Sequence, residues 1–352
     1  MTFTQPPLIE EIRAEVQATT HRQRMQNSMR TQLRRNPDND LFKIKTADQW
    51  LNDDYGKPVA RKLIGSLWHE HELCILFADT NLGKSILAVQ IGSGLAKQTM
   101  MEPFGSQVNE ALKVLYIDFE LSSAQFRARY THREYGLHHF GDHFIRAEFN
   151  PAGSNPLLYE QYDAYVRDNI ESAIKNTKAQ VLIIDNITCI GSQTGNTTGA
   201  LPLMNNLKAI KAKYKLSVLV LAHTPKRNVY RPITVNDLQG SKMLINFADS
   251  AFAIGQSHIQ PGVRYLKQIK QRNTANDYGG DNVCLFVIKQ DVSFLNLEFL
   301  GYDQEINHLQ KPGIGISEEH KLQIAELSRQ GLTKKQIADN LKISIATVKR
   351  YN

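Results

Sequence analysis

The sequence predicts an α/β protein whose main domain is a mostly parallel sheet flanked by helices. Between about residues 61 and 303, short apolar or β-branched runs alternate with longer amphipathic segments, which is the pattern of strand–helix–strand crossovers. The last apolar runs of this region follow one another with short links, which predicts antiparallel strands that extend the C-terminal edge of the sheet. Three short helical segments come after a stretch with proline and glycine, so a small all-α domain is predicted at the end.

Composition limits the classes of function. The chain has 352 residues, enough for one large domain with an appendage, and its net charge of +7 favours polyanionic partners. Its three cysteines show no CxxC spacing, which indicates buried thiols in a reducing compartment. No run of eighteen apolar residues occurs, so we expect no membrane span and a cytoplasmic location.

Four parts are predicted along the chain. Residues 1–60 form a basic helical arm, because the first 36 residues hold six arginines against three acids. Residues 61–310 form the main α/β domain. Residues 311–316 are a linker, and residues 317–352 are a helix-turn-helix domain. The arm is either a segment that docks on a neighbouring subunit or on nucleic acid, or a solvated tail.

The elements of the main domain follow from their apolar patterns. Runs of five or six apolar and β-branched residues predict buried strands, and segments with apolar residues three or four apart predict helices. The expected parallel strands are residues 73–77, 114–119, 144–149, 181–185 and 218–223, and the expected helices are 86–91, 122–134, 157–175 and 203–214. The expected antiparallel run is 250–254, 265–270, 283–289 and 294–299.

A phosphate-binding loop is the strongest motif in the sequence. It comprises Ala78, Asp79, Thr80, Asn81, Leu82, Gly83, Lys84 and Ser85, and a helix follows from Ile86. In a loop between a strand and a helix, backbone N–H groups and the helix N-terminus bind nucleotide phosphates. Lys84 is expected to reach the β- and γ-phosphates and Ser85 to ligate Mg²⁺, so ATP and Mg²⁺ are the predicted cofactors. Ala78 stands where glycine is usual, and alanine tolerates most backbone conformations that are not left-handed.

Two acidic residues end strands at the same edge of the predicted sheet. Asp185 closes an apolar strand and is expected to hold Mg²⁺ beside Ser85. Glu120 follows the neighbouring strand, where a carboxylate can polarise an attacking water. A lone acid at a strand end is often only a surface residue, but two such acids beside one phosphate loop favour a hydrolytic site.

These motifs together resemble the RecA/DnaB superfamily of ATPases, and within it the plasmid-type RepA hexameric replicative helicases. The resemblance covers roughly residues 60–300 and depends on the phosphate loop, on Asp118-Phe119-Glu120, on the strand ending at Asp185 and on Leu221-Ala222-His223-Thr224. It implies that Glu120 is the catalytic base and that His223 senses the γ-phosphate.

The same resemblance implies a ring, expected to be a hexamer, with active sites between subunits. Lys270 and Arg272 on a late strand would reach the nucleotide of the neighbouring subunit, with Arg272 as an arginine finger. From the residues alone, both side chains are equally well explained as the polar face of an edge strand.

Two loops are candidates for binding single-stranded DNA. One is residues 191–199, and the other is residues 225–239 with Lys226, Arg227 and Arg231 around Tyr230. The superfamily resemblance implies that such loops line a central channel, and basic side chains beside an aromatic ring suit sequence-independent binding. Ordinary surface loops would have the same length and glycine content.

The end of the chain resembles a helix-turn-helix DNA-binding unit. Its expected small core is Ile337, Ala338, Leu341, Ile343 and Val348, and residues 317–352 hold seven basic against four acidic residues. The third helix would direct Thr347, Lys349 and Arg350 toward the major groove of duplex DNA. A docking bundle that does not touch DNA is the alternative.

The sequence therefore predicts a Mg²⁺-dependent ATPase that forms a ring and couples hydrolysis to single-stranded DNA. The alternative is a DNA-binding regulatory ATPase, serving transposition, partition or transcription control, that unwinds nothing. A small-molecule kinase is a third reading, which Glu120 and the basic loops disfavour.

Overall fold

A computed structural model describes most of the chain. The described residues are 19–20, 23–24, 42–56, 59–99, 101–150, 162–187, 200–225, 227–238, 242–310, 318–341, 343 and 345–351. The contacts divide the chain into two units, Met1–Val59 and Ala60–Asn352. In the first unit, helix α2 (Ala47–Asp54) begins with a capping box in which Thr46 and Gln49 bond to each other's backbone N–H. Most of the predicted basic arm lies outside the described residues.

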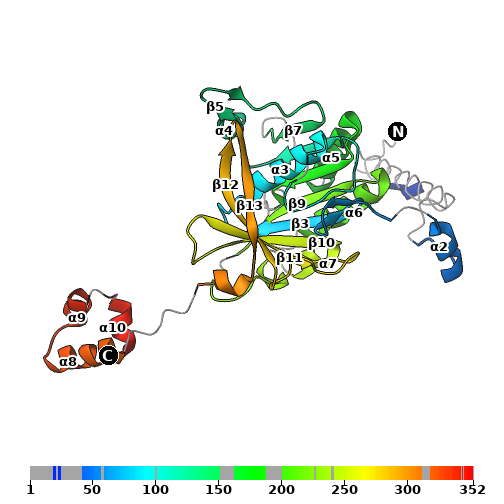
Figure 1. Cartoon of the computed structure of the whole chain (residues 1–352). Coiled ribbons are helices and arrows are strands. Elements are labelled where there is room, and N and C mark those ends of the chain that lie inside the picture. Colours follow the sequence, from blue (N-terminus) through cyan, green and yellow to red (C-terminus); the bar gives the residue numbers. More distant parts are fainter. Residues whose placement is uncertain are drawn as a thin grey trace, which may run out of the picture. The chain divides into compact units, whose positions relative to one another are not determined.

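In the described part of the second unit, the main element is a sheet of nine strands in the order β13-β12-β11-β10-β3-β9-β8-β4-β7 (Figure 1). The strands are β3 (Leu73–Ala78), β4 (Val114–Asp118), β7 (Phe144–Glu148), β8 (Val181–Asp185), β9 (Ser217–His223), β10 (Ser250–Gln256), β11 (Val263–Lys270), β12 (Val283–Asp291) and β13 (Phe294–Asp303). The six strands from β10 to β7 are parallel, and β11, β12 and β13 continue the sheet in antiparallel order. The predicted α/β class, with a mostly parallel sheet and antiparallel strands at its C-terminal edge, is thus confirmed.

One strand differs from the prediction. The run of antiparallel strands was expected to start at residue 250, but β10 is parallel to β3, with Ser250 opposite Cys74 and Ile254 opposite Ala78. The chain between β9 and β10 contains helix α7 (Lys242–Phe247), and this long crossover allows the parallel return. The sheet therefore becomes antiparallel one strand later, at β11.

Helices cover both faces of the sheet, and the strand residues alternate between the two cores. Helix α3 (Lys84–Lys97) packs on one face, and α5 (Tyr162–Thr177) and α6 (Ala200–Tyr214) pack on the other. In β3, the side chains of Cys74, Leu76 and Ala78 join the α3 core, and those of Leu73, Ile75 and Phe77 join the opposite core. A Cβ on Gly92 would lie 2.7 Å from Cε2 of Phe144, so glycine permits this close approach of α3 to the sheet.

Short elements connect these layers. They are β1 (Lys62–Ile64), β2 (Trp68–His69), α4 (Ser123–Arg129), β5 (Thr131–His132), β6 (Gly136–Leu137), η7 (Val235–Asp237) and η8 (Glu305–His308). Helix α4 starts with a capping box between Ser122 and Gln125, as its sequence favours. It ends at Arg129, earlier than predicted, because the chain turns there into the β5–β6 hairpin.

The three helices predicted at the end of the chain are present as α8 (Glu318–Arg329), α9 (Lys334–Leu341) and α10 (Ile345–Tyr351). Thr333 caps α9, and a small core forms around Ile337, Ala338 and Val348, together with Ile324 of α8. The predicted linker, residues 311–316, lies outside the described residues. Among the helices that the structure describes, none has the length and apolar character needed to cross a bilayer.

Candidate nucleotide site

The phosphate loop joins β3 to α3 and has two residues with positive φ. These are Asn81 (φ 64°) and Gly83 (φ 94°), which are residue types that tolerate this conformation. Ala78 is different, because its φ is not positive and its side chain is 1 % exposed in the α3 core. It ends β3 between His223 on β9 and Ile254 on β10. The loop therefore does not require glycine at its first position.

Lys84 lies at the centre of the loop. Its ammonium donates to the carbonyl oxygens of Ala78 (2.9 Å) and Asp79 (3.0 Å) and to Nδ1 of His223 (3.1 Å). Burial lowers the pKa of Lys84, although nearby carboxylates, first among them that of Glu120, oppose this shift. A cation held here against backbone carbonyls can exchange these contacts for phosphate oxygens.

Lys84, His223 and Glu120 form a hydrogen-bonded chain. The ammonium of Lys84 can only donate, so Nδ1 of a neutral His223 accepts, and its Nε2–H then donates to Oε1 of Glu120 at 3.2 Å. Asn186, which follows β8, donates to the same oxygen. The hydrogen bond from His223, with smaller help from Asn186, lowers the pKa of Glu120 against the effect of burial. Glu120 is thus held as an ionised acceptor.

Asp185 is the buried carboxylate of the site. It is 1 % exposed, and burial, reinforced by the negative charges of Glu120 and Asp118, raises its pKa to about 6. The hydroxyls of Tyr116 and Ser85 hydrogen-bond to it and act in the opposite direction. Mg²⁺ prefers oxygen ligands. The hydroxyl of Ser85 and the carboxylate of Asp185 lie next to each other, so together they fit a Mg²⁺ ion bound beside the phosphate loop.

Asp118 fixes the turn that carries Glu120. Its Oδ1 accepts from the backbone N–H groups of Glu120 (3.0 Å) and Leu121 (2.9 Å), and its Oδ2 pairs with Arg146 of β7 at 2.9 Å. The side chain of Asp118 is fully buried, so its acceptors are used within the protein. Asp118 and Arg146 therefore position Glu120 rather than contact a ligand.

Sequence reasoning missed Arg129, which lines the site. A cavity of about 190 Å³ is lined by the phosphate loop, Glu120 and His223, and also by Arg129 at the end of α4. Among the described residues, none forms a hydrogen bond or ion pair with the Arg129 side chain, so its guanidinium can bind a phosphate or a base. The only signal in the sequence was a basic residue nine positions after Glu120, and only the path of α4 brings it to the loop.

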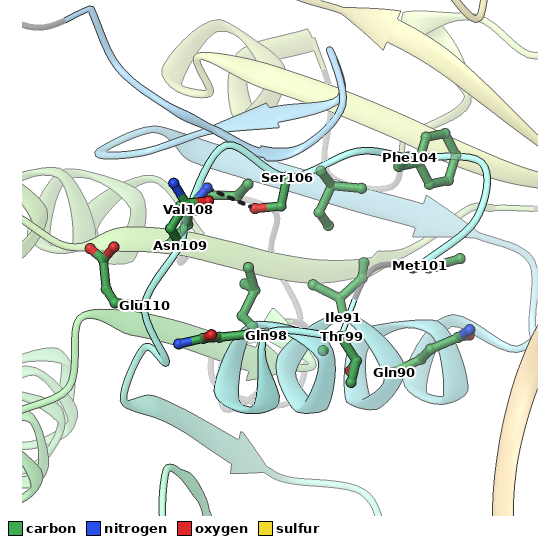
Figure 2. Close-up of a pocket in the computed structure, with 14 residues that line it drawn as sticks. Gln90, Ile91, Gln98, Thr99, Met101, Phe104, Ser106, Val108, Asn109 and Glu110 are labelled. Carbon is green, nitrogen blue, oxygen red and sulfur yellow. Dashed lines mark hydrogen bonds between the residues drawn. The ribbon is translucent and has the colours of Figure 1, made fainter.

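A second cavity, of about 240 Å³, lies beside the second half of α3 (Figure 2). It is formed between that helix and residues 101–110, and its wall mixes apolar side chains with amides such as those of Gln90 and Gln98. Its one acidic residue, Glu110, pairs with Arg61, whose side chain also bonds to Glu70. The residues that line this cavity do not place reactive side chains next to one another, and we assign no chemistry to it.

Lys270 and Arg272 lie at the opposite end of the sheet from the phosphate loop of their own chain. Lys270 pairs with Ala251 in the sheet, and its ammonium donates to the carbonyls of Ile245 (2.7 Å) and Ala248 (2.8 Å) at the end of α7. Arg272 pairs with Asp249 at 3.1 Å, and Asp249 also accepts from the N–H of Leu73, the first residue of β3. Their predicted role toward a neighbouring subunit is not tested by these contacts.

The candidate DNA-binding residues have different surroundings. The side chain of Arg227 is only 4 % exposed, because it reaches the carboxylate of Asp79 (3.6 Å) and donates to the carbonyl of Arg231 (3.1 Å); its predicted contact with DNA is not tested by these contacts. Arg231 and Tyr230 are exposed. Lys349 of α10 is exposed and Thr347 is half-buried. Lys226, the side chain of Arg350 and the loop 191–199 lie outside the described part of the structure.

Comparison with known proteins supports the nucleotide site. Residues 39–229, just over half of the chain, match the family described as the AAA domain. The protein belongs to this family and is a P-loop ATPase. The matched residues include the phosphate loop, Glu120, Asp185 and His223, and they end before Arg272 and the three C-terminal helices.

Among solved structures, a KaiC-like protein of the hyperthermophilic archaeon Pyrococcus horikoshii OT3 is similar, with 14 % identity and a TM-score of 0.48 over 68 % of this chain and all of that one. No curated protein matches the sequence.

Proposed function

We propose that this protein is a Mg²⁺-dependent ATP hydrolase that forms a ring, a hexamer, and couples hydrolysis to binding of or movement along single-stranded DNA, in the manner of a RepA-like replicative helicase. The observation that carries the hydrolytic part is the hydrogen-bonded chain from Lys84 through His223 to Glu120. It connects the phosphate-binding cation to an ionised carboxylate that lines the same cavity.

In this proposal each side chain has a defined task. Lys84 and Arg129 bind phosphate oxygens, and Ser85 and Asp185 would hold Mg²⁺, which would neutralise charge on the phosphates. Glu120 accepts a hydrogen bond from the attacking water and orients it, while His223 can exchange its contact with Glu120 for one with the γ-phosphate. Such an exchange would make the orientation of Glu120 depend on the nucleotide that is bound.

The position of Arg272 supports assembly as part of the proposal. It lies near the amino end of β3, and the six residues of β3 span about 20 Å, so it is too far away to serve the loop of its own chain. A head-to-tail contact brings different faces of two copies together and closes into a ring when the rotation allows. In such a contact Arg272 would exchange Asp249 for the phosphates bound by a neighbour.

The DNA-binding part of the proposal depends on two surfaces. The exposed Tyr230 and Arg231 lie in the segment after β9, whose strand carries His223 at its end. An aromatic ring and a guanidinium suit stacking and contact with the backbone of a single strand. The three C-terminal helices would contact duplex DNA through α10, with Lys349 as its exposed cation.

A regulatory ATPase that binds DNA without unwinding it is the second candidate. The observation that favours it is the three-helix unit, which has its own buried core and is the only part of the described chain that resembles a duplex-binding motif. In that case ATP would control assembly on duplex DNA.

The test combines mass, ATP turnover and strand displacement. We expect a hexamer in the presence of nucleotide, ATP turnover that rises with single-stranded DNA, and displacement of a strand from a forked duplex. Lys84→Ala, with the fold retained, is the control that should abolish turnover. DNA-stimulated turnover without displacement would favour the regulatory ATPase, and a monomer with no response to DNA would contradict both candidates.

A further inference from the structure

The third residue of β4, Tyr116, is buried directly behind the acidic end of β8. Its side chain is fully buried in the α3 core, and its ring stacks on Phe144 with a centroid distance of 6.0 Å. Its hydroxyl donates to Oδ2 of Asp185 at 2.5 Å. A buried carboxylate without hydrogen-bond donors is costly, and within the described part of the chain the hydroxyls of Tyr116 and Ser85 are the side-chain donors to Asp185.

The other nearby polar groups already have partners. Arg146 is already paired with Asp118, and Asn186 donates to Glu120. The ammonium of Lys84 is occupied by two carbonyls and His223. Ser85 is the residue expected to face the metal, so the orientation of the Asp185 carboxylate depends on Tyr116.

We propose that Tyr116 is a positioning residue for the magnesium site, which fixes one oxygen of Asp185 so that the other faces Ser85 and the ion. This inference rests on the proposed ATP hydrolase function and names a further residue of that site. Mg²⁺ demands near-ideal octahedral geometry, so a carboxylate that can rotate binds it less well. Loss of a hydrogen-bond partner behind a metal ligand typically costs 10- to 100-fold in metal affinity.

Tyr116→Phe removes only the hydroxyl and keeps the ring in its place. Tyr130→Phe is the matched control, because Tyr130 is also a buried tyrosine in the α3 core, but its hydroxyl has no hydrogen-bond partner in the described structure. Both variants lose one buried oxygen, and only the first loses a contact with Asp185. Thermal unfolding of each would establish that the fold is retained.

The measurement is the binding of a fluorescent ADP analogue as a function of Mg²⁺ concentration, with EDTA as the metal-free reference. We expect Tyr116→Phe to bind the analogue in EDTA as the wild type does, and to need at least about tenfold more Mg²⁺ to reach the metal-bound affinity. Tyr130→Phe should follow the wild-type curve. An unchanged Mg²⁺ dependence in Tyr116→Phe would overturn the inference, and so would an equal loss of binding with and without the metal.

A double-mutant cycle gives a second, independent test. Asp185→Asn alone should remove most of the dependence on Mg²⁺, and adding Tyr116→Phe to it should then change nothing further. Additive losses in the double variant would mean that Tyr116 acts elsewhere. If the wild-type protein binds the analogue equally well with Mg²⁺ and with EDTA, the proposed function itself fails, and this outcome is separate from any result with Tyr116.

Discussion

Asp185→Asn should make the metal-free protein more stable while it destroys the magnesium site. Asp185 is almost fully buried, and its pKa is raised from 3.8 to about 6, chiefly by that burial. A carboxyl group with a raised pKa in the folded state holds its proton more tightly there than in the unfolded chain. The folded state therefore loses stability as the pH rises from 3.8 through about 6, and the full penalty is present above that range.

The size of the penalty follows from the shift. A difference of about two pKa units at about 1.4 kcal/mol each corresponds to about 3 kcal/mol at pH 8. By the same relation the penalty is only about 1 kcal/mol at pH 4.5, because Asp185 is then protonated in most of the folded molecules. Asparagine is close in shape to aspartate, its carbonyl can accept from Tyr116, and it carries no charge to bury.

Urea unfolding in EDTA, followed by circular dichroism at pH 8 and at pH 4.5, measures this effect. We expect Asp185→Asn to be about 3 kcal/mol more stable than the wild type at pH 8 and about 1 kcal/mol more stable at pH 4.5. An equal difference at both pH values would show that ionisation of Asp185 is not the cause. A variant less stable than the wild type at pH 8 would refute the argument, because the hydrogen bonds of Asp185 would then outweigh its desolvation.

Three further predictions concern ATP turnover. Glu120→Gln should lower kcat by about 10²- to 10⁴-fold while nucleotide binding is retained, and Glu134→Gln, an exposed acid, should have no effect; an unaltered kcat in Glu120→Gln would remove Glu120 from the mechanism. Arg129→Ala should raise the KM for ATP by about tenfold or more through the loss of a charge-assisted hydrogen bond, and Arg127→Ala, an exposed arginine of the same helix, is its control. Arg272→Ala should be inactive alone, and mixing it with Lys84→Ala should restore part of the activity. The reason is that some subunit interfaces in the mixture combine an intact phosphate loop with an intact Arg272. No recovery of activity would leave Arg272 as the partner of Asp249 only.

The sequence predicted the nucleotide loop well because its signals are local. The loop, its strand and its helix are consecutive, and Asp185 could be placed because parallel strands end at the same edge of a sheet. The doubt about Ala78 came from the motif, and the structure removes it, since the positive φ angles fall on Asn81 and Gly83 instead.

The remaining parts of the site depend on packing that no local pattern encodes. Arg129 reaches the cavity because α4 stops after seven residues, and its neighbour Tyr130 packs against rings such as that of Phe294 at the tip of the β12–β13 hairpin. In the sequence, Tyr116 cannot be distinguished from the other buried residues of its strand. Only the pairing of β4 with β8 places its hydroxyl against Asp185. Contacts between residues distant in the sequence decide both cases.

Arg227 has a contact within the protein that the sequence did not predict. A basic residue in a loop after β9 suggested a DNA contact, but its guanidinium is buried against Asp79 in the phosphate loop. Thr224 of the same segment donates to the other oxygen of Asp79 at 2.5 Å. Since Asp79 follows the last residue of β3, two side chains of the segment that carries Tyr230 and Arg231 are bonded directly to the loop that binds phosphate. Arg227 therefore connects the nucleotide site directly to the candidate DNA-binding segment.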